Sequence, residues 1–201
     1  MGKLQDSNKK AGSSNANAEC CNDKCKKTMG PHKMSQKGID FLKGYESEVK
    51  KNGKHVLYND DLGYCTIGYG HLVNGKKSCS KISQTHKNKY TKGLTDAEAE
   101  ALLKKDIEKR EKEVNQKIKV PLCQQEFDAL MSLYYNIPAS LKYKYSIRRA
   151  LRRNDYEGAK QAISLWNKGT INGKKVALKG LTKRRKAEQN IFGCGIYDST
   201  H

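Results

Sequence analysis

The sequence predicts an α+β fold that is predominantly helical and carries a small antiparallel β-sheet. A stretch between about residues 49 and 67 is rich in turn signals and in residues that favour strands. From residue 95 onwards, apolar residues recur at helical spacing in several consecutive segments. Because the strand-like stretch precedes these segments and does not alternate with them, we expect a separate small sheet beside a helical body.

The chain divides into a polar arm, residues 1–34, and one domain, residues 35–201. The arm consists largely of Lys, Asn, Ser and Gly and has almost no large apolar side chains. Such a segment cannot bury enough surface to offset its ordering entropy, so a disordered arm or linker is predicted. Ser35 is a candidate N-cap for the first helix, in which Phe41, Leu42 and Tyr45 share a face and which ends near Glu46.

The sheet is expected after this helix. Asn52-Gly53 is a strong hairpin signal, because both residues tolerate positive φ. Strand propensity follows in His55–Tyr58 and in Tyr64–Ile67, with Gly63 between them. Segment 74–93 is polar, rich in Lys and without a clear period, and it is predicted to be a loop.

The helical body is predicted to begin at the capping box Thr95-Asp96-Ala97-Glu98, which opens a long amphipathic helix. Pro121 separates that helix from a second apolar helix, which ends at Pro138. Three further helices are expected over residues 140–153, 156–166 and 181–192, with a turn at Asn172-Gly173 and a stop at Gly193.

The chain is strongly basic, with 40 Lys and Arg against 21 Asp and Glu and a net charge of +19. This excess implies a polyanionic partner, namely nucleic acid, an anionic envelope or an acidic polymer, and charge alone does not choose among them. Eight basic residues are expected on helix surfaces, either as a solvated face or as a patch for an anionic partner: Arg148, Arg149, Arg152, Arg153, Lys183, Arg184, Arg185 and Lys186.

No window reaches the ~18 uninterrupted apolar residues that a membrane helix needs, so no transmembrane segment is expected. The polar N-terminus also lacks the apolar core of a secretory signal. Synthesis in the cytoplasm without an ordinary signal peptide is therefore predicted.

The seven cysteines form an odd set, which together with the missing signal argues against a complete disulfide framework. Cys20, Cys21 and Cys25, with His32 nearby, could form a zinc knuckle, but their spacing is poor and solvated reduced thiols are favoured. Two others lie inside apolar patterns and are interpreted as small buried hydrophobes: Cys65 and Cys123.

Two acidic residues are candidates for acid–base chemistry. Glu46 falls at a predicted helix C-terminus, where the helix dipole and apolar neighbours disfavour the charged form, as a general acid requires. Asp60 lies in a polar turn, and Thr66 follows six residues later with a hydroxyl that can fix water. Two carboxylates on one cleft are the minimum for cleaving a glycosidic bond. The alternative is structural: a solvated Glu at a helix end, and an Asp that caps its turn.

The motifs around these residues resemble those of the phage-type lysozymes. The first motif is FLKGYE at residues 41–46, and the second is the run from Leu57 to His71, which ends in TIGYGH. Similarity continues through LTDAEA (94–99), VPL (120–122), QEFDAL (125–130), YYN (134–136), NDY (154–156) and RRKAE (184–188). It covers roughly residues 35–194 and indicates the T4-like muramidases and lambdoid endolysins of glycoside hydrolase family 24.

The resemblance implies a lysozyme-like fold with the sheet lobe next to the active-site cleft. It implies that Glu46 is the general acid and that Asp60, with Thr66, assists the water or stabilises the charged intermediate. No metal ion or organic cofactor would be required. Three residues would line the glycan cleft: Leu72, Tyr135 and Ser146.

The spacing departs from the family pattern in one place. Thirteen residues separate Glu46 from Asp60, several more than in the shorter members of the family. The hairpin at Asn52-Gly53 can absorb the surplus at the cleft edge. Asp61 offers an alternate register, although only Asp60 keeps the family spacing to Thr66. His71 is expected to be a hydrogen-bonded structural residue.

The predicted function is that of a muramidase, which hydrolyses the β-1,4 bond between N-acetylmuramic acid and N-acetylglucosamine in bacterial peptidoglycan. One alternative is a non-hydrolytic lytic transglycosylase on the same fold. Another is a basic protein that binds nucleic acid or the envelope, but no nucleic-acid-binding signature accompanies the charge. The protein would act in the periplasm or on the cell wall, as a phage endolysin released through a holin or as an antibacterial effector injected by a secretion apparatus.

Overall fold

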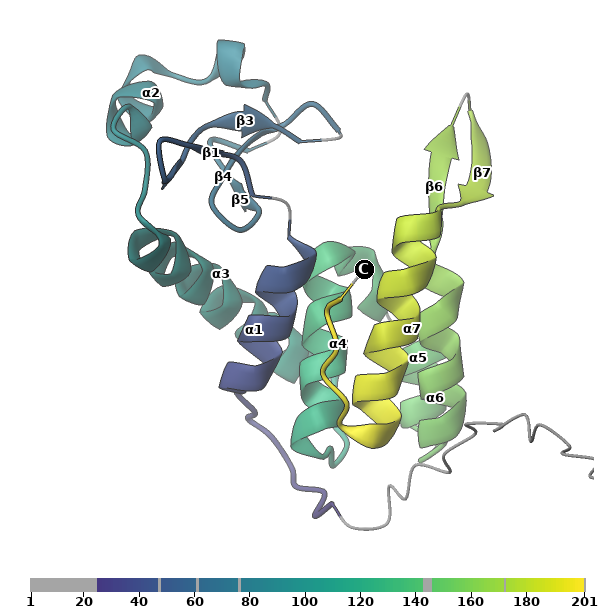
Figure 1. The fold of residues 1–201 in the computed structure, drawn as a ribbon. Helices are drawn as coiled ribbons and strands as arrows, with labels where there is room; N and C mark the ends of the chain where they lie inside the picture. The colour runs from purple at the N-terminus through teal and green to yellow at the C-terminus, as the bar shows by residue number, and fades with distance from the viewer. Residues whose placement is uncertain are drawn as a thin grey trace, which may run out of the picture.

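The computed structural model describes residues 25–46, 48–60, 62–75, 77–142, 146–171 and 173–200. A small lobe of strands and short helices lies at one end of the long helix α3 (Asp96–Lys117), and the remaining helices form a body at its other end (Figure 1). The predicted α+β class, with helix dominant and antiparallel strands, is confirmed.

Helix α1 (Gln36–Tyr45) begins and ends where the sequence predicts. The hydroxyl of Ser35 accepts a hydrogen bond from the Gly38 N–H at 3.1 Å and so caps the helix. At the other end, the backbone N–H of Glu46 donates to the Leu42 carbonyl at 3.1 Å. The buried face of the helix, which includes Phe41, packs against α4 (Gln124–Asn136) beside it (Figure 1).

The strands form a hairpin and a three-stranded antiparallel sheet. Asn52 and Gly53 take φ values of 51° and 73°, which confirms the predicted hairpin. In the three-stranded sheet Thr66, on the central strand, pairs with Tyr58 on one side and Leu72 on the other. The strands are β1 (Lys50–Lys51) and β2 (Lys54–His55) in the hairpin, and β3 (Tyr58–Asn59), β4 (Cys65–Ile67) and β5 (His71–Leu72) in the sheet.

The segment predicted to be a loop, 74–93, contains two short helices instead. These are the 3-10 helix η2 (Cys79–Lys81) and the helix α2 (Gln84–Tyr90), which begins at the cap residue Ser83. Helix α2 has seven residues and buries only Tyr90, so no helical period is visible in its sequence. A small core of five buried residues holds this lobe together: Cys65, Ile67, Val73, Ile82 and Tyr90.

The helical body shares one larger core that runs through α3, α4 and the last helix. The predicted capping box at Thr95 is confirmed: the side chains and N–H groups of Thr95 and Glu98 bond reciprocally. The described helices that follow α4 are η3 (Pro138–Leu141), α5 (Ser146–Leu151), α6 (Tyr156–Ile163), η4 (Ser164–Trp166) and α7 (Lys179–Cys194).

Two predicted helix bounds are wrong. The third predicted helix starts at Ser146 and not near residue 140, because η3 occupies residues 138–141 and residues 143–145 lie outside the described part of the chain. The last helix continues through Gly193 and ends at Cys194, and Gly195, with a φ of 65° and a ψ of 24°, is its left-handed C-cap.

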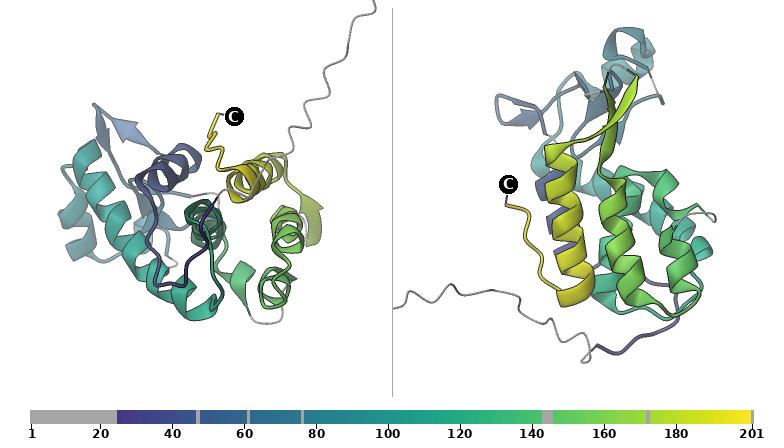
Figure 2. Two further views of the ribbon diagram at one scale, coloured as in Figure 1. Left: turned by 90° about the horizontal axis from the view of Figure 1, so that it is seen from below. Right: turned by 90° about the vertical axis from the view of Figure 1, so that its right-hand side faces the viewer.

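The turn predicted at residues 172–173 belongs to a longer hairpin, although Asn172 itself lies outside the described residues. Strands β6 (Lys168–Ile171) and β7 (Lys174–Ala177) project from the helical body at the end of α7 (Figures 1 and 2). Gly169 permits the close packing at its base, because a Cβ there would lie 2.5 Å from a methyl group of Leu178.

Residues 25–34 differ from the disordered arm predicted for 1–34, of which residues 1–24 lie outside the described part. Thr28 forms an antiparallel bridge with Leu122, through bonds of 3.0 and 2.9 Å. The His32 backbone exchanges hydrogen bonds with the Asn115 amide, each 2.8 Å long. These contacts are made by backbone and polar groups, so an analysis of apolar content does not reveal them.

The interpretation of the cysteines is corrected in the same region. Cys25 forms a disulfide with Cys123, and Cys65 forms one with Cys79; Cys194 is also disulfide-bonded. Reduced thiols were predicted because the cysteine count is odd and no secretory signal was seen. The predicted burial of Cys65 and Cys123 is confirmed, at 0% and 1% exposed, but both are disulfide-bonded. The proposed knuckle residues Cys20 and Cys21 lie outside the described residues.

None of the described helices combines the length and the apolar character that crossing a bilayer requires.

Candidate active site

Glu46 lies at the C-terminal end of α1, where the chain leaves the helix and turns towards the strands. Its side chain is 14% exposed. The glycine of the TIGYGH run that faces it is Gly70: a Cβ at this position would lie 2.8 Å from Glu46 Oε2. Gly70 has a φ of 80°, so both its conformation and the close approach of the carboxylate require glycine. The first two motifs of the sequence therefore meet at Glu46.

The carboxylate of Glu46 forms an ion pair with Arg184 of α7, with 3.0 Å between Oε1 and Nη2. The guanidinium also lies 5.4 Å from the centre of the Tyr45 ring. The sequence predicted apolar neighbours for Glu46. It did not predict the buried Arg184 that pairs with the Glu46 carboxylate. Arg184 holds the carboxylate against the face of the helical body.

Arg184 and Arg185 were predicted on the surface, but they are 4% and 1% exposed. Both contact the fully buried carboxylate of Glu188: Arg184 Nε donates to Oε1 at 3.2 Å and Arg185 Nη2 donates to the same oxygen at 3.0 Å. The Ser132 hydroxyl of α4 donates to this oxygen as well, at 2.8 Å. Burial raises the pKa of Glu188, and the two Arg side chains oppose that shift.

A signal for this burial was present in the sequence. Arg184, Ala187, Glu188, Ile191 and Phe192 follow the i, i+3, i+4, i+7, i+8 pattern of one helix face, and all five are buried. The pattern shows that the two charged members share the face of the apolar ones, so they must be paired with each other.

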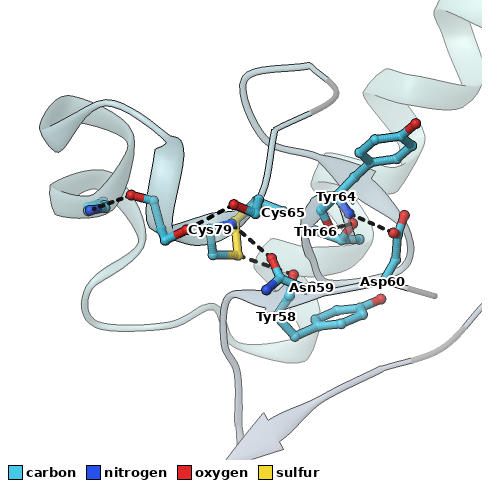
Figure 3. The surroundings of a disulfide bond; sticks show 10 residues. Tyr58, Asn59, Asp60, Tyr64, Cys65, Thr66 and Cys79 are labelled. Atoms are coloured by element: carbon cyan, nitrogen blue, oxygen red, sulfur yellow. Dashed lines mark hydrogen bonds between the residues drawn. A yellow bond between two sulfur atoms is a disulfide. The ribbon is translucent and has the colours of Figure 1, made fainter. Parts of the chain in front are cut away.

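Asp60 occupies the turn between β3 and β4. Its Oδ1 accepts a hydrogen bond from the N–H of Tyr64 at 2.8 Å (Figure 3). The same oxygen accepts from the N–H of Leu62 at 2.9 Å. Asp60 therefore does cap its turn, as the structural alternative stated. No described residue hydrogen-bonds to its other oxygen, Oδ2. The alternate candidate Asp61 lies outside the described residues.

Thr66 lies beside the same turn, on the central strand β4, and is 2% exposed. Its hydroxyl donates to the carbonyl of Tyr64 at 3.1 Å, whereas the N–H of Tyr64 is bonded to Asp60 (Figure 3). Because the hydroxyl proton is engaged, the oxygen of Thr66 remains an acceptor. Tyr64 thus connects the two predicted residues through its backbone.

The disulfide between Cys65 and Cys79 lies immediately beside Thr66 (Figure 3). The N–H of Cys79 donates to Asn59 Oδ1 at 2.8 Å, and the N–H of Cys65 donates to the Lys77 carbonyl at 2.6 Å. Segment 77–79 is therefore attached to both β3 and β4, the strands that flank Asp60.

Tyr135, a predicted cleft residue, lies on α4 and is 6% exposed. Its ring carbon Cε1 would be 3.7 Å from a Cβ at Gly70, on the side where Glu46 lies. Burial, with a contribution from Glu46, raises the pKa of Tyr135, so its hydroxyl stays protonated and donates to the Tyr69 carbonyl at 3.2 Å. The structure therefore brings Tyr135 and Glu46 together.

Of the other two predicted cleft residues, Leu72 pairs with Thr66 across the sheet, whereas Ser146 lies on a different element. Leu72 is on β5, 39% exposed, and Ser146 is half-buried at the first position of α5. His71 Nδ1 lies 2.7 Å from Asp106 Oδ2 of α3, so the expected hydrogen-bonded role is confirmed. Among the described residues no three His, Cys, Asp or Glu side chains are grouped as metal ligands.

The helical body, the small sheet lobe and the acid at the end of the first helix define the lysozyme-like class of folds. The chain matches the family described as phage lysozyme over residues 50–188. It is 35% identical to an endolysin of Acyrthosiphon pisum secondary endosymbiont phage 1, over 79% of this chain and 97% of that protein.

Solved structures of similar proteins have the same fold. The endolysin from Escherichia coli O157:H7 phage FAHEc1 has a TM-score of 0.69 and 33% identity, over 85% of this chain and 99% of that one. The muramidase domain of SpmX from Asticaccaulis excentricus has a TM-score of 0.63 and 26% identity, over 80% and 97%. The chain belongs to the phage lysozyme family. It is a glycoside hydrolase that lyses bacterial peptidoglycan, and the lysozyme-like fold is confirmed.

Proposed function

We propose that Glu46 is the general acid and that Asp60, with Thr66, directs the water in hydrolysis of the β-1,4 bond between N-acetylmuramic acid and N-acetylglucosamine. The observation that carries this assignment is the position of the Glu46 carboxylate, partly exposed between α1 and Gly70. We further assign the chain to the T4-like and lambdoid branch of glycoside hydrolase family 24.

The proposed reaction needs a proton on the leaving oxygen and a water molecule at the anomeric carbon. Glu46 transfers its proton to the glycosidic oxygen as the carbon–oxygen bond breaks. The water oxygen forms the new bond to the anomeric carbon and loses its proton to the free Oδ2 of Asp60. Thr66 accepts a hydrogen bond from that water, which its engaged hydroxyl allows.

Leu72, Tyr135 and Ser146 are proposed to contact the glycan. Tyr135 has support from its position beside Gly70 and Glu46. Leu72 has support from its place on β5, two residues after Gly70. For Ser146 the support is the family resemblance alone.

The test is incubation of the full-length protein and Glu46→Gln with purified peptidoglycan, followed by mass spectrometry of the products. We expect muropeptides with reducing ends from wild type, and a rate at least ~100-fold lower for Glu46→Gln. Glu48→Gln is the matched control, because Glu48 is exposed two residues away and pairs with Lys50. Anhydro products would instead identify the transglycosylase reaction, and full activity of Glu46→Gln would refute the assignment.

For delivery we propose synthesis in the cytoplasm and release through a holin, because the similar proteins include phage endolysins. Expression in a bacterium with and without an inducible holin tests this. Lysis should require holin induction, and lysis in its absence would contradict the proposal.

A further inference from the structure

A pocket lies beside Gly70, the glycine that faces Glu46. This pocket, of about 410 Å³, lies between β5 and α3, and its lining begins at Gly70 and continues through Leu72 to Arg110 of α3. Gly70 is also the residue against which the Glu46 carboxylate and the Tyr135 ring lie. The pocket and the Glu46 carboxylate therefore both adjoin Gly70.

The charged groups of this pocket fall into two kinds. Its acids have partners: Asp106 bonds to His71 at 2.7 Å, and Glu113 accepts from the Tyr134 hydroxyl at 2.6 Å. Its cations, Lys109 and Arg110, form no salt bridge with any described carboxylate. The negative charges are thus engaged within the protein, and the positive charges are available to a ligand.

Arg110 is the more specific of the two cations. Its side chain is half-buried, and its guanidinium lies over the Tyr135 ring, with 4.5 Å between Cζ and the ring centre. The ring is itself fixed by burial and by its hydrogen bond to Tyr69. A guanidinium held by its face presents its N–H groups at the edge, the geometry that binds a carboxylate with two parallel hydrogen bonds.

We propose that this pocket binds a carboxylate of the peptide attached to the muramic acid, with Arg110 as the anion-binding residue. The proposal rests on the proposed function, since it takes peptidoglycan as the substrate. The N-acetylated sugars of the glycan are neutral apart from lactyl groups that the peptide occupies, so the carboxylates of the polymer lie in its peptides. The pocket shares Leu72 with the proposed glycan contacts and continues to Arg110 on α3, which is where a branch of the bound glycan would lie.

The experiment measures binding with the full-length Glu46→Gln protein, in which hydrolysis is prevented. Two ligands are compared by calorimetry: solubilised glycan strands that carry stem peptides, and the same strands after an amidase has removed the peptides. Adding Arg110→Gln should weaken binding of the peptide-bearing strands about tenfold to a hundredfold and leave binding of the stripped strands unchanged. Arg110→Lys should fall between, because it keeps the charge and loses the paired hydrogen bonds.

Lys105→Gln is the matched control, since it removes one positive charge from an exposed position of the same helix outside the pocket. Equal weakening for both ligands, an effect of Arg110→Gln no larger than that of Lys105→Gln, or no binding of peptide-bearing strands would overturn the proposal. Failure of the proposed function would be seen separately, as absence of peptidoglycan cleavage by the wild-type protein.

Discussion

Glu46 is held by side chains from α7, more than 130 residues along the chain, whereas Asp60 is held by the backbone of its own turn. Around Glu46 the supporting charges are buried: Arg184 forms an ion pair with Glu46, and Glu188 accepts a hydrogen bond from Arg184. Around Asp60 the supporting groups are two N–H groups, a short strand and a disulfide. One half of the proposed site therefore depends on tertiary packing, and the other on local structure and a covalent bond.

The difference follows from the size of the two cores. The helical body has a continuous core that excludes a charged network from water, whereas the apolar core of the sheet lobe has five buried residues. A buried carboxylate is stable only when paired, so the body can hold a charge network rigidly but is vulnerable to loss of one member. In the lobe, short strands gain little from burial, and the disulfide restricts the unfolded chain.

The largest effect should come from Glu188→Gln. The substitution leaves Arg184 and Arg185 buried without their shared counter-charge, which costs about 3–5 kcal/mol of unfolding free energy. Urea unfolding at pH 7 measures it. Glu157→Gln, which removes an exposed carboxylate paired with Lys160, is the control and should change stability little. A similar small loss for Glu188→Gln would show that the network does not support the body.

Removing the lobe disulfide, with Cys65→Ser and Cys79→Ser together, should cost about 3 kcal/mol, since the bond closes a loop of 14 residues. The loss should be local. Hydrogen exchange under oxidising conditions should show faster exchange at β4 and unchanged exchange in α4 and α7. Equal loss of protection in both regions would mean that the lobe and the body unfold as one unit, and that the disulfide does not stabilise the lobe separately.

Two substitutions distinguish the role of Asp60 in its turn from its proposed role in catalysis. Asp60→Ala removes the acceptor for both turn N–H groups and should cost about 1–2 kcal/mol, whereas Asp60→Asn keeps an acceptor oxygen and should cost less. Both should lose muramidase activity, because neither retains the carboxylate. Activity assays and thermal unfolding are measured on the same preparations; an active Asp60→Asn would reduce Asp60 to a turn residue.

What the sequence predicts well is local. The Asn52-Gly53 hairpin, the Ser35 cap and the Thr95 capping box follow from the chemistry of neighbouring residues, and each is present. Glu46 and Asp60 were selected from local motifs as well, and their catalytic roles remain a proposal that the substitutions above test. The helical part of segment 74–93 was missed because α2 is two turns long and buries a single side chain.

What the sequence does not predict depends on distant partners. The pairing of Cys25 with Cys123 joins residues 98 positions apart, and no local pattern encodes it. The burial of Arg184 and Arg185 depends on the counter-charge of Glu188 and on Ser132 of a different helix. Charged residues in a basic run are expected in solvent, and only the presence of apolar residues on the same helix face indicates otherwise.

The smallest expected effect concerns the contact between α1, which carries Glu46, and α3. Lys43 of α1, three residues before Glu46, pairs with Glu100 of α3 at 2.7 Å, and Lys104 pairs with the same carboxylate. Hydrogen bonds from Lys43 and then Lys104 lower the pKa of Glu100 to about 2. Because the folded state lowers this pKa, the pair contributes stability above the ordinary glutamate pKa, and this contribution is lost as pH falls towards 2.

Glu100→Gln should therefore be less stable than wild type at pH 7, by less than about 1 kcal/mol, because the pair is partly exposed and screened by solvent. The difference between the two proteins should shrink between pH 4.5 and pH 2, which urea unfolding at several pH values measures. Glu108→Gln, on the exposed face of the same helix, should show no such change. If the Glu100→Gln difference stayed constant with pH, the link between α1 and α3 would be packing alone, and the charge pair would not help to position the helix that carries Glu46.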